Sequence, residues 1–182
     1  AIAFAFRPHL YMSPNDGCPD GEPYWAAMVF DNAAWGGGTH VRIAYMPAYY
    51  RDCGTLGLTG HIGDSEFIML QVGWDRATRH WVLERSFLSA HDDSPTDAST
   101  NNSWQEMFYP DGSQTRRSPK VFVAKNKHGN YRSDAACEAA GFAADSCRQT
   151  FAGQLRVPRH RNVGSHNVDL VGCVLSEEST RP

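Results

Sequence analysis

The chain has 182 residues, which is enough to bury one sizeable hydrophobic core, so we expect a single domain over residues 1–182. Hydrophobic residues make up 41% of the chain and charged residues 20%, a composition that excludes wholesale disorder. The net charge of -3 provides no general attraction for nucleic acid, and no apolar run approaches the roughly 18 residues of a transmembrane helix. We therefore expect neither a nucleic-acid partner nor a transmembrane segment.

In chain order, the first predicted elements are strands. Loops rich in proline and glycine surround one short apolar element at Tyr24–Phe30, and a strand with an irregular end at Pro47 follows at Val41–Tyr50. Two segments rich in β-branched and aromatic residues, Ser65–Trp74 and Arg79–Ser89, are separated by four residues. This spacing predicts a β-hairpin.

The second half predicts a long loop, a short helix and further strands. The segment 92–118 is polar and unusually long for a connection. Ser133–Ala140 is predicted as a helix with Ser133 or Asp134 as its N-cap. Additional strands are expected at Pro119–Lys125, Leu155–Val157 and Val168–Leu175. These elements predict a mainly β fold, an antiparallel β-sandwich or barrel with one or two short helices and long loops.

The cysteine pattern favours disulfides over a metal knuckle, because no CxxC pair is present. Cys137 and Cys147 flank a short segment and are the expected pair, whereas the partners of Cys18, Cys53 and Cys173 stay open. The sequon Asn101-Asn102-Ser103 and a first residue other than methionine add weak support for export. We expect a secreted, extracellular and monomeric protein.

One short segment carries the residues of a metal site: Gly60-His61-Ile62-Gly63-Asp64-Ser65-Glu66. In a strand that begins near Asp64, alternation places Asp64 and Glu66 on one face, at the start of an apolar stripe. Two carboxylates at the end of a buried face need compensation, and a divalent cation provides it. The flanking glycines allow His61 to fold toward the same point.

The donor set favours magnesium, calcium or manganese, with zinc as a further candidate. The alternative is that both acidic residues pair with arginines at a sheet rim while His61 caps a turn.

This heptapeptide resembles the GHRHDWE motif of the necrosis-inducing protein family, whose glycine, first histidine, aspartate and glutamate stand at the same offsets. It is also similar to the HxGDWE segment of the vacuolar protein sorting 62-like family, through Gly63-Asp64. The similarity covers roughly residues 41–131, where Ser89-Ala90-His91 resembles a later SAH and Lys127-His128 stands near a later family histidine.

The resemblance implies a secreted β-sandwich whose cation is held by Asp52, His61, Asp64, Glu66 and, more loosely, His128. Ile62, Gly63 and Ser65 replace the Arg, His and Trp of the toxin motif, and Asp52 lies one residue further upstream than the family spacing. Because function depends on the particular site, the resemblance bears on fold and metal binding more than on toxicity.

Three hypotheses follow. The first is a secreted effector or lectin-like protein that binds a divalent cation and recognises a glycan or lipid head group. The second is a metal-dependent hydrolase or lyase with a metal-bound water, in which His91 or His128 acts as the catalytic acid or base. The third is a purely structural secreted domain. No serine nucleophile elbow, phosphate loop or HExxH helix is present, which weakens other hydrolytic and nucleotide-driven chemistry.

Overall fold

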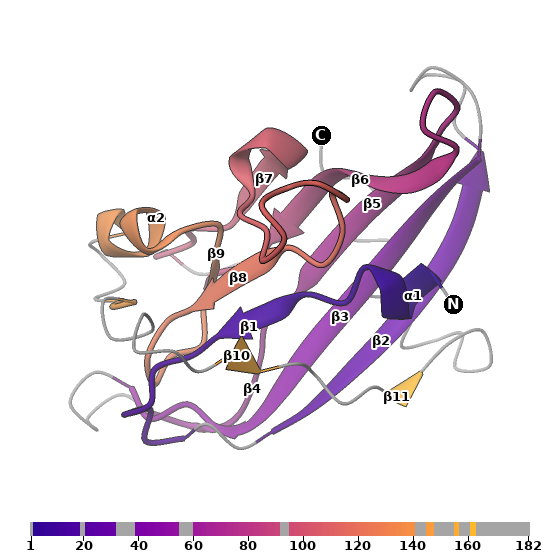
Figure 1. The fold of residues 1–182 in the computed structure, drawn as a ribbon. Helices are drawn as coiled ribbons and strands as arrows, with labels where there is room; N and C mark the ends of the chain where they lie inside the picture. The colour runs from indigo at the N-terminus through magenta and orange to yellow at the C-terminus, as the bar shows by residue number, and fades with distance from the viewer. Residues whose placement is uncertain are drawn as a thin grey trace.

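A computed structural model describes residues 2–18, 21–31, 39–54, 60–91, 95–140, 145–147, 155–156 and 161–162. It shows a mainly β protein in which two sheets pack face to face (Figure 1). The predicted fold class is therefore confirmed.

The larger sheet has the strand order β11-β2-β3-β5-β6-β7, with β4 paired to β3. Its strands are β2 (Gly21–Asp31), β3 (Thr39–Arg51), β4 (Ile62–Ser65), β5 (Ile68–Asp75), β6 (His80–Leu88), β7 (Thr100–Ser103) and β11 (Arg161–Asn162). The smaller sheet has the order β10-β1-β8-β9. Its strands are β1 (His9–Tyr11), β8 (Lys120–Val123), β9 (Asn130–Tyr131) and β10 (Leu155–Arg156). Two pairs, β1 with β8 and β11 with β2, are parallel, and the other described pairs are antiparallel.

The core forms where the inner faces of the two sheets meet. Alternate residues of β3 face their partners on β5 in the pairs Ile43 with Leu70 and Tyr45 with Ile68, and all four side chains are fully buried. Val121 of β8 brings the smaller sheet into the same hydrophobic cluster. The alternating apolar positions thus fix the register of the central strands.

The predicted hairpin is present as β5 and β6. Its turn is held by the Asp75 carboxylate, which accepts hydrogen bonds from the Ala77 and Thr78 amides at 2.8 and 3.3 Å. One part of the prediction was wrong, because Ser65–Trp74 is not a continuous strand: β4 ends at Ser65 and β5 begins at Ile68. Glu66 therefore lies at a break between two strands.

Other elements differ in length or were not predicted. The expected long loop contains β7 and the 3-10 helix η2 (Trp104–Glu106), and the short helix α1 (Ile2–Ala5) and strands β1 and β9 were also missed. These elements have at most four residues each, too few to show a period. The strand expected at Val168–Leu175 lies outside the described residues.

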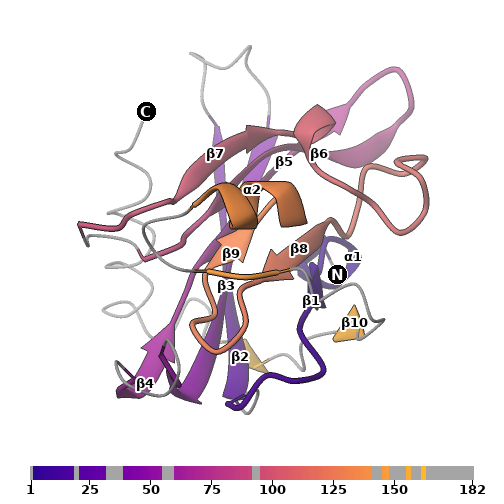
Figure 2. The ribbon, with the colours of Figure 1, turned by 90° about the vertical axis from the view of Figure 1, so that its left-hand side faces the viewer.

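The predicted helix is present as α2 (Asp134–Ala139), which lies against β9 (Figure 2). The Ser133 hydroxyl caps it by accepting a hydrogen bond from the Ala136 amide at 3.0 Å. The expected disulfide between Cys137 and Cys147 is present, and a second joins Cys18 to Cys53. None of the helices that the structure describes is long and apolar enough to cross a membrane.

Candidate cation site

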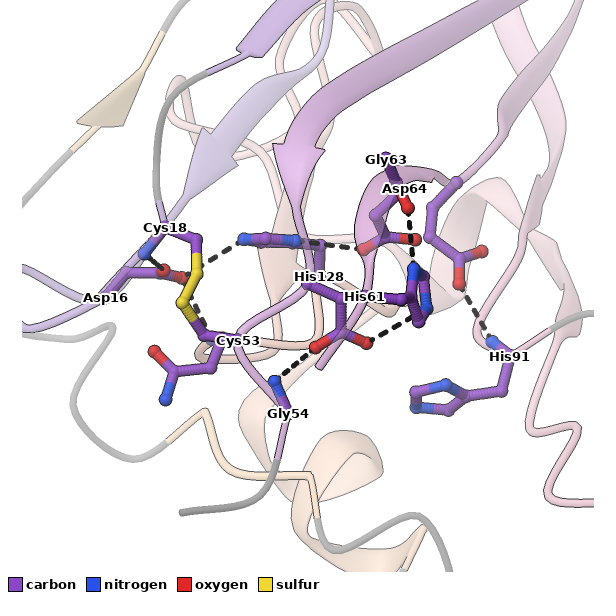
Figure 3. A network of polar contacts seen from close by, with 12 residues as sticks. Asp16, Cys18, Cys53, Gly54, His61, Gly63, Asp64, His91 and His128 are labelled. Atoms are coloured by element: carbon purple, nitrogen blue, oxygen red, sulfur yellow. Dashed lines mark hydrogen bonds and ion pairs between the residues drawn. A yellow bond between two sulfur atoms is a disulfide. The ribbon is translucent and has the colours of Figure 1, made fainter. Parts of the chain in front are cut away.

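Four chain segments meet at the end of the sandwich where β3 stops and β4 begins (Figure 3). They are residues 16–18 after β1, 52–54 after β3, 61–66 in and after β4, and 126–128 between β8 and β9. The Cys18–Cys53 disulfide joins the first two, and the Cys53 amide donates to the Asn126 carbonyl at 2.9 Å. The site is therefore assembled from segments that are far apart in the sequence.

Asp52 and His61 face each other where the ladder between β3 and β4 continues. Each backbone amide donates to the carbonyl of the other residue, at 3.0 and 3.1 Å. The His61 Nε2 lies 3.6 Å from Asp52 Oδ2, and its Nδ1 donates to the Gly63 carbonyl at 2.7 Å. Asp52 is buried, whereas 60% of the His61 side chain is exposed. The imidazole therefore lies at the solvent side of this pair.

His128 lies between two carboxylates and is fully buried. Its Nδ1 donates to Asp64 Oδ2 at 2.9 Å, and its Nε2 lies 3.6 Å from Asp16 Oδ2, an ion-pair distance. The ring stacks on Tyr49, with ring centroids 3.7 Å apart and planes 8° apart. The backbone has a φ of 58°, a left-handed conformation that few residues with side chains adopt. Contacts on several sides therefore fix the orientation of this imidazole.

The two carboxylates also set the protonation of His128. Burial lowers the pKa of His128, but the hydrogen bonds and charges of Asp16 and Asp64 outweigh this and raise the pKa to about 9. Burial raises the pKa of Asp16, but His128 and the backbone amides of Asn126 and Cys18 lower it by more. His128 is thus an internal cation at neutral pH.

Glu66 is a carboxylate whose ionised form is disfavoured by burial. It is buried, and it accepts hydrogen bonds from the Ser89 hydroxyl and, at 3.0 Å, from the His91 amide. Burial raises the pKa of Glu66 to about 7, against the effect of these two bonds, and the charge of Asp64 adds to the increase. A positive charge placed here would favour the ionised form of Glu66.

A second polar cluster lies next to Glu66 and contains the predicted catalytic residue His91. Its Nε2 donates to Asp145 Oδ2 at 2.9 Å, and the Tyr131 hydroxyl donates to the same oxygen. Lys127 Nζ lies 3.9 Å from the other oxygen of Asp145, whose side chain is fully buried. The pKa of His91 is raised by the hydrogen bond to Asp145, although burial opposes this. His91 is thus held by a carboxylate, as catalytic histidines are, while its own amide contacts the candidate cation site.

The five predicted metal ligands lie at the same end of the sandwich but not around one point: Asp52 faces His61, Asp64 bonds His128, and Glu66 bonds Ser89 and the His91 amide. Within the described ranges, no three His, Cys, Asp or Glu side chains are arranged to hold a metal ion. The chemistry of the donors fits a divalent cation, because mostly buried carboxylates outnumber the one buried imidazolium.

Of the two predicted catalytic residues, only His91 is partly exposed. His128 is fully buried with both ring nitrogens facing carboxylates, a geometry that suits positioning of Asp64. Sequence reasoning missed Asp16 and Asp145. Asp16 stands two residues before Cys18, and Asp145 stands two residues before Cys147. Knowledge of the Cys18–Cys53 disulfide would have predicted that Asp16 lies on the same side of the molecule as Asp52.

Comparisons with protein-family models, with curated proteins and with solved structures found no match to this chain.

Proposed function

We propose that this protein is a secreted, divalent-cation-binding effector or lectin-like protein that recognises a glycan or lipid head group through its cation. The observation that carries the proposal is the gathering of four mostly buried carboxylates at one end of the sandwich, where the one buried imidazole, His128, faces only two of them. These carboxylates are Asp16, Asp52, Asp64 and Glu66. Such an excess of buried negative charge is unfavourable unless a cation compensates it.

Asp52, His61, Asp64 and Glu66 would hold the cation, with His128 fixing the Asp64 carboxylate behind them. Their oxygen-rich chemistry favours magnesium, calcium or manganese, and His61 also suits zinc. When bound, such a cation supplies a positive charge that attracts sugar hydroxyl pairs or phosphate oxygens. The resemblance of this segment to the necrosis-inducing and vacuolar protein sorting 62-like families supports the same ligand set.

Exposed apolar side chains next to the site support recognition of a ligand at this end. Ile62 is 93% exposed and lies on β4, the strand that carries Asp64, and Tyr50 is 65% exposed and lies on the paired strand β3. Aromatic and aliphatic side chains beside a polar site provide contact area for a sugar ring or the upper part of a lipid. The two disulfides fit an extracellular location, since such bonds persist in oxidising compartments.

The first test is calorimetric titration of the chelator-stripped protein with calcium, magnesium and manganese. We expect one bound cation per chain, and we expect Asp64→Asn to weaken binding more than about tenfold. Asp111→Asn is the matched control, because Asp111 is an exposed carboxylate in the segment that precedes β8. Absence of binding to the wild type would overturn the proposal, and equal binding by Asp64→Asn would remove Asp64 from the ligand set. Glycan arrays and head-group liposomes then distinguish the two ligand classes.

A second candidate function, a metal-dependent hydrolase or lyase, is favoured by the hydrogen bond between His91 and Asp145. A partly exposed histidine oriented by a carboxylate beside a cation site is the arrangement of a general acid or base. A panel of ester, phosphoester and uronate substrates tests this function. Turnover that His91→Asn abolishes, with cation affinity unchanged, would establish it. Absence of turnover on every substrate would leave the binding protein as the better account.

A further inference from the structure

The Cys18–Cys53 disulfide joins two of the four segments that build the cation site (Figure 3). Asp52 directly precedes Cys53 in the chain. On the other side, the Cys18 amide donates to Asp16 Oδ1 at 2.8 Å. The disulfide therefore connects the carboxylate that faces His61 to the carboxylate that faces His128.

The segment 126–128 is tied to the disulfide through Asn126. Its side-chain oxygen accepts a hydrogen bond from the Gly17 amide at 2.8 Å, and its carbonyl accepts one from the Cys53 amide at 2.9 Å. Its own amide donates to Asp16 Oδ2 at 3.0 Å. Asn126 has a φ of 67°, a left-handed conformation that needs such support, and His128 follows two residues later. The position of His128 therefore depends on the residues on both sides of the disulfide.

Apart from the disulfide, residues 16–18 are held by polar contacts of single side chains and by no strand ladder. They lie between β1 and β2 and belong to neither sheet. Besides the disulfide, they are held by the bonds to Asn126, by the ion pair between Asp16 and His128, and by a turn bond from the Asp16 amide to the Ser13 carbonyl at 3.2 Å. Opening the disulfide would give this segment conformational freedom and would let Asp16 separate from His128. His128 then has Asp64 as its remaining carboxylate partner at the site, which draws Asp64 away from a cation.

We propose that cation binding is controlled by the oxidation state of the Cys18–Cys53 disulfide: the oxidised protein binds the cation, and the reduced protein releases it. This inference rests on the proposed function and adds a redox control to the same site. The reductant is a dithiol, either a small molecule or a protein of the thioredoxin type. One of its thiolates attacks a sulfur of the disulfide and the other resolves the mixed disulfide. Two electrons and two protons pass to Cys18 and Cys53, and the dithiol becomes a disulfide.

Exposure makes the reduction selective. Cys18 is 9% exposed and Cys53 is half-buried, whereas Cys137 and Cys147 are fully buried beside α2. A thiolate must approach a sulfur atom in line with the bond that it breaks, so the accessible disulfide reacts first. Limited reduction therefore changes the cation site while the second disulfide stays closed.

The experiment uses the Cys173→Ser protein, so that the fifth cysteine cannot exchange with the disulfides. Limited treatment with dithiothreitol followed by alkylation opens Cys18–Cys53, as mass spectrometry of the labelled peptides verifies. Calorimetric titration with calcium or manganese then compares the oxidised and reduced forms, and circular dichroism monitors the fold. We expect reduction, or the double change Cys18→Ser and Cys53→Ser, to raise the Kd at least about tenfold. The matched double change Cys137→Ser and Cys147→Ser leaves the Kd within about twofold.

The outcomes separate this inference from the function on which it rests. Equal affinity in the oxidised and reduced forms would overturn the redox control and leave the cation site standing, whereas an oxidised protein that binds no cation would overturn both. If the reduced protein loses its fold, Asp16→Asn in the disulfide-intact protein decides the matter. If the disulfide acts on the cation site through Asp16, Asp16→Asn should raise the Kd for the cation by about tenfold. An unchanged Kd in this variant would refute that route.

Discussion

His128 shows how much the surroundings of one residue decide its role. Its imidazole is stacked on Tyr49 and faces Asp16 and Asp64, which come from two other parts of the chain. The resemblance to known motifs implied His128 as a loose cation ligand. In the structure it is fully buried with its two ring nitrogens facing these carboxylates.

The positive charge of His128 predicts that the stability of the cation-free protein depends on pH. The pKa of His128 is raised to about 9, so its protonation stabilises the fold below an unfolded pKa near 6.5, and this stability is lost as pH rises through about 9. We expect the free energy of unfolding to fall by roughly 2 kcal/mol between about pH 7.5 and about 9.5. Urea titrations across this range measure it.

The controls for this prediction are two histidine variants. His128→Gln should remove the slope between the two pH values, because the titrating group is gone. His80→Gln, at an exposed position in the β5–β6 hairpin, should keep it. A slope that persists in His128→Gln would assign the pH dependence to another group.

At the residue scale, the sequence predicted the members of the site that are close together in the chain. Asp64 and Glu66 lie two residues apart, and His61 is three residues from Asp64, so local spacing indicated their association. Asp16 and Asp145 reach the site only through the packing of distant segments and through disulfides. No local period or spacing could show them.

At the scale of elements, the turn that carries His61 depends on a close backbone approach at Gly60. A Cβ atom at Gly60 would lie 2.3 Å from the Asp52 carbonyl oxygen and 2.9 Å from the Cys53 carbonyl carbon. Both atoms belong to the backbone and cannot move aside without disturbing the paired bonds between Asp52 and His61. Only glycine fits this position.

Gly60→Ala should therefore destabilise the protein by about 2–3 kcal/mol and weaken cation binding, because the His61 segment must shift. Gly63→Ala is the matched control. Gly63 has a φ of 75°, and a Cβ atom added there would meet no other atom within 4 Å. Alanine at this position should therefore lower the free energy of unfolding by only about 1–2 kcal/mol, through the unfavourable backbone conformation. Urea denaturation and cation titration of both variants measure these effects. If Gly60→Ala lost no more stability than Gly63→Ala, the close contact between Gly60 and the backbone of Asp52 and Cys53 would be contradicted.

Among the elements, the hairpin and the capped helix could be predicted because their signals are local. Segments rich in β-branched and aromatic residues on each side of a four-residue turn indicated β5 and β6, and Ser133 indicated the start of α2. β7 could not be predicted, because Thr100–Ser103 is wholly polar and is a strand only through its pairing with β6. Tertiary pairing overrides weak propensity in such segments.

At the scale of the whole molecule, stability depends on the core between the two sheets. Leu70 is fully buried in this core, so Leu70→Ala should lower the free energy of unfolding by about 2–5 kcal/mol through lost burial and the cavity it leaves. Ile62→Ala, at a side chain that is 93% exposed, should change it by less than about 0.5 kcal/mol. Urea denaturation measures both, and similar losses would contradict a core centred on β5.

The sequence predicted the sandwich class but not its sheet order. Composition and turn spacing indicated short strands with few helices, which suffices for a mainly β fold. The parallel pairing of β1 with β8, in which Leu10 lies opposite Val121, joins the first strand to a segment synthesised much later. Such long-range pairing leaves no periodic signal in either strand.

This pairing has a consequence for how the chain folds as it leaves the ribosome. Strands β2 to β6 follow one another and can associate as soon as they emerge, and Cys18 and Cys53 are separated by only 35 residues. β1 must wait for β8, so the smaller sheet closes over the core only when translation is well advanced. Nascent chains cut before β8 should therefore contain a formed first disulfide while leaving the inner face of the larger sheet open to chaperones.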